Sequence, residues 1–221
     1  MKRYVVFSFN FFPDQSPGAK RSKYLIDALL NEDVNIKLWL LTSTPRRYGQ
    51  NLKKKNIKND NYFDESLKSR VNILRFWIPY FGSSSIASAL SYSFYAIQTI
   101  PIAIFLRPNV VIATSAKLLT TSVAAISAKI SKAKFFIDIR DTFTDNYFYF
   151  YRWKKRIIFL SLIACLENLV IRSSNSINLI SKGFEDAFKG TERLALKYSI
   201  NFTNFSNGIS KNLKLKIRQK T

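Results

Sequence analysis

Short apolar runs alternate with helical patterns along most of the chain. Seven runs rich in β-branched and aromatic residues predict buried strands at Tyr4–Phe9, Asn35–Leu41, Val71–Trp77, Asn109–Thr114, Lys134–Ile139, Ser176–Ser181 and Asn201–Phe205. Between them, helical spacing of apolar residues predicts helices at Lys20–Leu30, Ser84–Leu106, Leu118–Ser131, Arg152–Ser173 and Lys182–Lys189. This alternation predicts a single Rossmann-like α/β domain, in which helices flank a mostly parallel sheet of about seven strands.

The segment Arg46–Arg70 interrupts the alternation. It holds eight basic and three acidic residues, many asparagines and the run Lys53–Lys55. This composition is typical of a mobile, solvated loop. A nucleic-acid-binding arm is also basic, but it usually adds a platform of stacking aromatic side chains. Here Tyr48, Tyr62 and Phe63 are scattered, which favours the loop.

Two long apolar stretches raise the question of membrane contact. Gly82–Leu106 carries no charge and is long enough to cross a bilayer. Because it contains several serines, Gln98 and Pro101, we expect a buried or membrane-facing helix instead. Ile157–Ile171 follows a basic flank that begins at Arg152, a pattern that fits both a helix lying on anionic lipid and an ordinary core helix. The short apolar run at the N-terminus predicts a strand and not a signal peptide.

Charge and composition narrow the classes of partner and chemistry. The 221 residues include Lys+Arg 35 and Asp+Glu 14, a formal net charge of +21, which favours phosphorylated ligands, nucleic acid or an acidic membrane surface. The chain has no histidine, which excludes Ser-His-Asp and Cys-His catalysis and every His-ligated metal site. The single Cys165 lies within an apolar run, which predicts a buried thiol in a reducing, cytoplasmic setting. We expect neither a metal site nor a cofactor.

Ligands of open parallel sheets bind beyond the carboxyl ends of the strands, so the residues after each strand are the candidates for chemistry. After the first strand, a loop with Ser16 and Gly18 leads into a helix with Arg21, where free backbone N–H groups can hold a phosphate. The chain has neither the dinucleotide-binding G-x-G-x-x-G pattern nor a P-loop. After the sixth strand, Ser181 is a natural N-cap and Lys182 a candidate phosphate contact.

The fifth predicted strand ends in a group of charged side chains that could take part in catalysis. Asp138 and Asp141 flank the guanidinium of Arg140 in the sequence Asp-Ile-Arg-Asp. Such a group can serve as a general base, or as a clamp for hydroxyl and phosphate groups. The same residues fit an internal ion pair plus a helix cap equally well.

The order and spacing of these motifs resemble bacterial family 4 glycosyltransferases of the GT-B fold. Phe9–Ala19, followed by Arg21 and Ser22, resembles the N-terminal segment of proteins of that family. Leu41–Tyr48 resembles the family's second strand and the loop after it. Asp138–Asp141 resembles the fifth-strand motif of the branch that transfers amino-fucose-type sugars in O-antigen and capsule assembly. Asn207–Ser210 is similar to the Asn-Gly-Ile-Asp turn that ends the family's N-terminal domain.

The resemblance implies two Rossmann-like domains that face each other across a cleft. The N-terminal domain binds the acceptor, often a lipid-linked sugar at the membrane surface, and the C-terminal domain binds the nucleotide-sugar donor. By this match Gly18 borders the phosphates, and Asp141 or Asp138 meets the acceptor hydroxyl. In a retaining mechanism of this kind the donor phosphate assists deprotonation, so Asp141 orients the acceptor without acting as a base. Together with the residues that follow the strands, this gives the expected substrate-binding residues, which are Gly18, Ser16, Arg21, Arg140, Ser181 and Lys182.

The chain also departs from the family pattern. Ser210 stands where the family has Asp, and the chain ends eleven residues later, before the family's donor-binding domain. We therefore expect residues 1–210 to form the acceptor-binding domain, residues 211–221 a basic tail, and the chain alone to be inactive.

Three functions follow in order of preference. The first is the acceptor-binding half of a retaining glycosyltransferase in surface polysaccharide assembly, peripheral on the inner face of the cell membrane. Its partners would be a nucleotide-sugar donor, a lipid-linked sugar acceptor and an anionic membrane surface. The second is a non-catalytic membrane-surface module left by gene truncation. The third, a nucleic-acid-binding protein, lacks any recognition motif, so no nucleic acid is expected as a partner.

Overall fold

The computed structural model describes residues 1–14, 16–45, 62–79, 81, 85–114, 118–139, 156–179 and 201–204. The strands are β1 (Lys2–Phe7), β2 (Ile36–Ser43), β3 (Val71–Phe76), β4 (Val110–Thr114), β5 (Lys134–Ile139), β6 (Ser176–Leu179) and β7 (Asn201–Asn204). The helices are α1 (Pro17–Glu32), α2 (Glu65–Lys68), α3 (Ser85–Phe105), α4 (Leu118–Ser131) and α6 (Arg156–Ser173). All seven predicted strands are present, with ends that differ by at most two residues from the prediction. The predicted helix Lys182–Lys189 lies outside the described residues.

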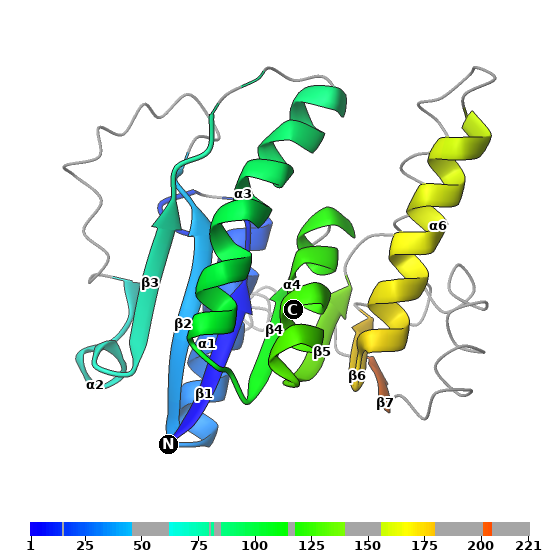
Figure 1. Ribbon diagram of the computed structural model, residues 1–221. Helices are drawn as coiled ribbons and strands as arrows, with labels where there is room; N and C mark the ends of the chain where they lie inside the picture. Colours follow the sequence, from blue (N-terminus) through cyan, green and yellow to red (C-terminus); the bar gives the residue numbers. More distant parts are fainter. Residues whose placement is uncertain are drawn as a thin grey trace, which may run out of the picture.

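The strands form one parallel sheet in the order β3-β2-β1-β4-β5-β6-β7 (Figure 1). The chain builds outward from β1 to β3, and then crosses back to place β4 on the other side of β1. This is the strand order of the Rossmann fold, and the reversal between β1 and β4 is its topological switch point. The predicted fold class is therefore confirmed.

Helices cover both faces of the sheet, which is why the strands are apolar on both sides. On one face α3, α4 and α6 pack around a core that includes Phe7 and Ile137 (Figure 1). On the other face α1 and α2 pack around a second core that includes Val6 and Ile26. The strands all run toward the same edge, the carboxyl edge, where the first turn of α1 also begins.

Part of the predicted loop is in fact structured. Glu65–Lys68 forms α2, and Phe63 and Leu67 are buried in the second core. The polar and charged composition of the segment concealed these two apolar anchors, which are four residues apart. Residues 46–61 of the predicted loop lie outside the described residues.

The prediction that Cys165 is buried is wrong. Its side chain is exposed on α6, whereas Ile163 and Val170 of the same helix are buried. Successive residues advance by about 100° around a helix, so Cys165 stands nearly opposite Ile163. An apolar run on a helix therefore did not imply burial of each of its members.

The long helix α3 has one buried and one exposed face. It packs Tyr95 and Ala103 into the first core, and it leaves Phe94 and Ile97 exposed. Among the described residues, no helix has both the length and the apolarity needed to cross a bilayer.

Candidate functional site

A row of polar side chains crosses the sheet at the carboxyl edge, on the face that packs against α1. We call it the polar row, and from β3 to β7 its members are Arg75, Thr42, Ser8, Thr114, Asp138, Asn178 and Thr203. Neighbouring members on β2 and β3, and on β4 to β7, are register partners in the parallel sheet. Ser8 directly follows β1, whose last residue pairs with Leu41 of β2 and Ala113 of β4, so it comes level with the members on those strands.

A buried ion pair ties α1 to the centre of the polar row. The Arg21 guanidinium donates from Nε to Asp138 Oδ2 and from Nη2 to Asp138 Oδ1, both at 2.6 Å. Asn178 Nδ2 donates to Asp138 Oδ1 at 2.8 Å, and the Thr203 hydroxyl donates to Asn178 Oδ1 at 3.2 Å. Asp138 is only 3% exposed. Of the two interpretations of the sequence, the structure therefore shows the internal ion pair for Asp138, with Arg21 as the partner.

A cluster of hydroxyl groups joins α1 to the strands at the switch point. The buried Ser22 hydroxyl lies 2.7 Å from Ser8 Oγ and 2.8 Å from Thr114 Oγ1. It also donates to the carbonyl oxygen of Gly18 at 2.9 Å. Ser8 Oγ also donates to the carbonyl oxygen of Asn10 at 2.9 Å, so these hydroxyl groups share a small number of protons in one cluster. Ser22 thus links β1, β4 and the first turn of α1.

The loop between β1 and α1 is held by side chains of β2 and β3. Thr42 Oγ1 and Ser43 Oγ donate to the carbonyl oxygen of Phe9, at 3.3 and 2.7 Å. Arg75 Nη2 donates to the carbonyl oxygen of Phe12. These bonds fix the path of the loop before the helix begins, so the helix start has a defined position above the switch point.

The first turn of α1 has the features of an anion site. Ser16 is the N-cap, and its Oγ accepts from the backbone N–H of Ala19 at 3.2 Å; Pro17 follows directly as the first helical residue. Gly18 comes next and has no Cβ, so a ligand can approach the backbone closely. Helix N-termini carry partial positive charge, which favours a phosphate at this position. Since Pro17 has no N–H and those of Ala19 and Lys20 bond to Ser16, the backbone donor for such a ligand is the N–H of Gly18.

The β2–β3 part of the carboxyl edge is packed with aromatic rings. Phe11 stacks on Phe63 with a centroid distance of 6.0 Å, and the Arg75 guanidinium lies 5.9 Å from the centre of the Tyr62 ring. Burial lowers the pKa of Arg75, while Tyr62 and the buried Asp14 act in the opposite direction. Because this half is filled by side chains, we place the candidate site on the other half, around β1, β4 and β5.

The structure brings together four of the predicted site residues. Ser16, Gly18 and Arg21 lie in or next to the first turns of α1, and Arg21 contacts Asp138. The other four lie outside the described residues, and their roles stay predictions: Asp141, Arg140, Ser181 and Lys182. Among the described residues, no group of three or more Cys, Asp or Glu side chains gathers to hold a metal ion.

Sequence reasoning missed most of the polar row. Ser8, Thr114 and Asn178 were not singled out, although each now has a defined contact at the edge. Ser22 of α1 was named only as part of the resemblance, without its contacts to Ser8 and Thr114. A signal was present, because Thr114 and Asn178 are polar residues at or next to the last position of otherwise apolar strands. A comparison of the residues at or next to the carboxyl end of all seven predicted strands would have found the polar row.

Comparison with known proteins gives likenesses of structure and none of sequence. No protein-family model matches the chain, and no curated protein matches its sequence. One similar solved structure is the apo form of the lipopolysaccharide outer core galactosyltransferase WaaB, at 11% identity and a TM-score of 0.44, covering 86% of this chain and 42% of that one. Another is Alr3699/HepE of Anabaena in complex with UDP-glucose, at 11% identity and a TM-score of 0.46, covering 100% of this chain and 50% of that one.

The complex of the same Anabaena protein with UDP and glucose gives nearly the same figures, with 12% identity and a TM-score of 0.46. The chain spans half or less of the length of these structures. With TM-scores below 0.5, the likenesses carry no argument about what this chain binds or does. Its function has to be inferred from its own residues.

Proposed function

We propose that this chain is the acceptor-binding half of a retaining glycosyltransferase, acting on a lipid-linked sugar in the assembly of a surface polysaccharide. The observation that carries the proposal is the first turn of α1 at the topological switch point, with Gly18 at its second position. Two further features support it. The motifs resemble the family 4 glycosyltransferases, and the net charge of +21 favours a phosphorylated ligand.

In this proposal the diphosphate of the acceptor lies at the N-terminus of α1. The N–H of Gly18 and the partial positive charge of the helix end attract the phosphate, and the missing Cβ of Gly18 leaves room for its oxygens. Asp141 meets the acceptor hydroxyl and orients it. The nucleotide-sugar donor would be held by a second domain of the kind that the family resemblance implies, and the amino-fucose branch is the proposed sugar class.

Asp138 has a positioning role in this proposal. Both of its oxygens accept hydrogen bonds from Arg21, so the carboxylate is poorly placed to remove a proton from a substrate. Its ion pair instead fixes the end of β5 against α1. Asp141 follows that end by two residues, so the pair anchors the segment from which Asp141 extends.

The change of Gly18 to Val tests the phosphate site directly. Gly18 lies inside a helix, where any L-residue fits, and glycine in a helix is less stable than alanine by about 1 kcal/mol. The variant should therefore fold as well as the wild type, while its side chain fills the space that the phosphate needs. We expect binding of a water-soluble, short-chain prenyl-diphosphate-linked hexosamine to weaken by about tenfold or more, measured by calorimetry.

The matched control is Asn31→Val, which places the same side chain in the exposed last turn of α1. Its affinity for the same ligand should equal that of the wild type. If Gly18→Val binds as tightly as the control, the phosphate does not lie at this turn and the proposal fails. If the wild type binds the prenyl diphosphate sugar no better than it binds inorganic phosphate, the acceptor class is wrong.

A further inference from the structure

Large apolar side chains are exposed together at one place on the surface. Five of them come from the connection after β3 and from α3, and each is between 39% and 71% exposed. We call this group the apolar patch, and its members are Trp77, Phe81, Leu90, Phe94 and Ile97. Single exposed apolar residues are normal on a protein surface, but a contiguous group marks a site of interaction.

The apolar patch is contiguous because its members contact or adjoin one another. Leu90, Phe94 and Ile97 are spaced by four and three residues, so they share one face of α3. The ring of Phe81 lies 5.4 Å from the ring of Phe94. Gln98 Nε2 donates to the carbonyl oxygens of Trp77 and Phe94, at 3.0 and 2.9 Å, which holds the β3–α3 connection against the helix.

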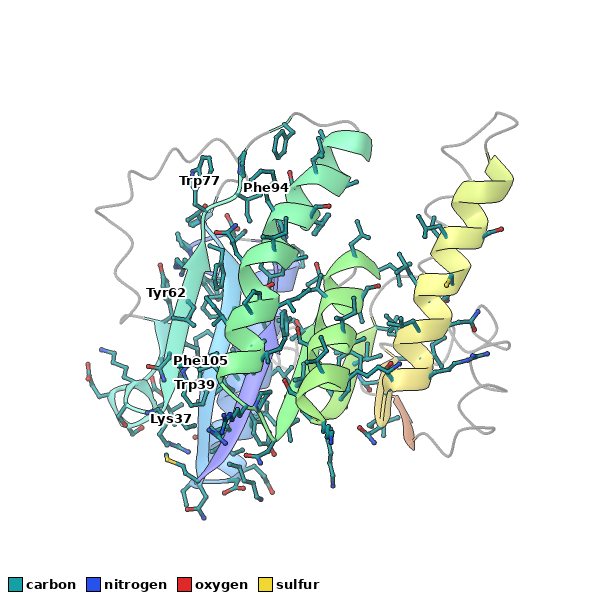
Figure 2. All side chains as sticks on the ribbon, in the orientation of Figure 1. Lys37, Trp39, Tyr62, Trp77, Phe94 and Phe105 are labelled. Atoms are coloured by element: carbon teal, nitrogen blue, oxygen red, sulfur yellow. The ribbon has the colours of Figure 1, made fainter. Side chains whose placement is uncertain are left out.

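The apolar patch lies at the same end of the molecule as the candidate site. Figure 2 shows Trp77 and Phe94 toward the end at which the strands finish, and Phe105 toward the opposite end of α3. The polar row marks that same carboxyl edge. A surface bound through the apolar patch would therefore lie next to the edge where α1 begins.

We propose that the apolar patch docks the protein on an anionic lipid bilayer by inserting into the interface between head groups and acyl chains. Trp and Phe side chains favour this interface. Helix α3 carries no charged residue over its 21 positions, so its exposed face enters the interface without dehydrating a charge. The net charge of +21 complements the negative surface of the bilayer and selects this partner over a neutral apolar one.

This inference rests on the proposed function in one respect, because a lipid-linked acceptor is reached at a membrane surface. The docking itself needs no sugar. It brings the carboxyl edge to the depth at which the diphosphate of such an acceptor is found.

Vesicle flotation with the intact chain tests the docking. The probes are vesicles of phosphatidylcholine alone and of phosphatidylcholine with phosphatidylglycerol. We expect the wild type to float with the anionic vesicles and to remain in solution with the neutral ones. The double variant Leu90→Ser/Ile97→Ser should partition into the anionic vesicles at least about tenfold more weakly, because it loses two inserted side chains.

The control variant is Phe105→Ser, which removes an 84% exposed ring from the other end of the same helix. It should float like the wild type. All three proteins should melt at the same temperature, since the changed side chains are exposed. If both variants lose flotation equally, any exposed apolar side chain of α3 promotes binding and the apolar patch is not a specific site. If the double variant floats as well as the wild type, the apolar patch does not insert into the bilayer. Either result overturns the proposal.

Three other outcomes separate this proposal from its rivals and from the proposed function. If sedimentation equilibrium shows a dimer that the double variant abolishes, the apolar patch binds a second copy and the membrane proposal is overturned. If the double variant loses flotation but still binds the soluble prenyl diphosphate sugar, the docking proposal is supported and the proposed function stands. If the wild type floats but does not bind that sugar, the proposed function fails and the docking proposal survives.

Discussion

Arg21 and Asp138 form a buried ion pair in which both charges are removed from water and depend on each other. The side chains are 15% and 5% exposed, and the two hydrogen bonds at 2.6 Å are bidentate. A buried pair of this kind adds little stability over an apolar replacement, but breaking it leaves an uncompensated charge. We therefore expect replacement of one partner to destabilise the fold strongly, and replacement of both by apolar residues to destabilise it little.

The Arg21→Met variant should lose about 3–5 kcal/mol of unfolding free energy, because the buried Asp138 loses the guanidinium that donates to both of its oxygens. Urea unfolding measures the change. The double variant Arg21→Met/Asp138→Leu should recover most of the loss. As a control on the same helix, Lys23→Met breaks the more exposed pair with Asp27 and should cost about 1 kcal/mol or less. Equal costs for the two single variants would contradict the account of this pair.

Tyr95 gives a second prediction at the residue scale, in the alkaline range. Its phenol is fully buried and donates to the carbonyl oxygen of Leu41 at 2.7 Å. Burial raises the pKa of Tyr95 well above its ordinary value of 10.0. The folded state therefore keeps this proton after the unfolded state has lost it, so the stability due to Tyr95 is present below pH 10 and falls as the pH rises above it.

We expect the unfolding free energy of the wild type to fall more steeply above pH 10 than that of Tyr95→Phe. The difference in slope should approach about 1.4 kcal/mol per pH unit, the value for one proton. Urea unfolding between pH 8 and pH 11 measures it. Tyr24→Phe, which removes a 53% exposed phenol, should keep the slope of the wild type. If Tyr95→Phe also keeps that slope, the phenol does not titrate as its burial implies.

At the scale of elements, the polar row explains how α1 is placed. Ser22 and Arg21 are adjacent on that helix, and they contact strands on both sides of the switch point. The apolar core beneath holds the helix on the sheet, but such packing tolerates small sliding. The hydrogen bonds of Ser22 and the ion pair of Arg21 instead specify one position. The N-terminus of α1 is thereby fixed relative to the end of β5.

The Ser22→Ala variant tests this placement. It removes the hydroxyl that links Ser8, Thr114 and Gly18, and it leaves buried polar groups without that partner. We expect a loss of about 1–3 kcal/mol in urea unfolding. The control Ser93→Ala removes a hydroxyl from the exposed face of α3 and should change stability by about 0.5 kcal/mol or less. If both variants are equally stable, the hydroxyl cluster does not position the helix.

The elements could be predicted from the sequence better than the contacts between them. Most strands have a compact apolar run, and all seven were found within two residues of their observed ends. Helix α2 was missed because four residues are too few to show a helical period. The pairing of Arg21 with Asp138 joins residues 117 positions apart, and no local pattern carries that information. Sequence reasoning named both residues but not their contact.

At the scale of the whole molecule, two features meet at the carboxyl edge of the sheet. The polar row fixes the turn in which Gly18 lies, and the apolar patch occupies the same end of the molecule. The opposite, amino edge has the connections Glu32–Ile36 and Leu106–Asn109, and none of the described candidate residues lies there. Binding of a ligand should therefore affect one edge of the sheet and leave the other unchanged.

Hydrogen exchange of the intact chain, with and without the soluble prenyl-diphosphate-linked hexosamine, shows which edge of the sheet binds the acceptor. Mass spectrometry of peptides reports where exchange slows. We predict slower exchange in the peptides that cover the start of α1 and the ends of β4 and β5, and no change in those that cover the amino edge. Protection at the amino edge, or none anywhere at a ligand concentration that saturates binding, would contradict the claim that the carboxyl edge is the acceptor site.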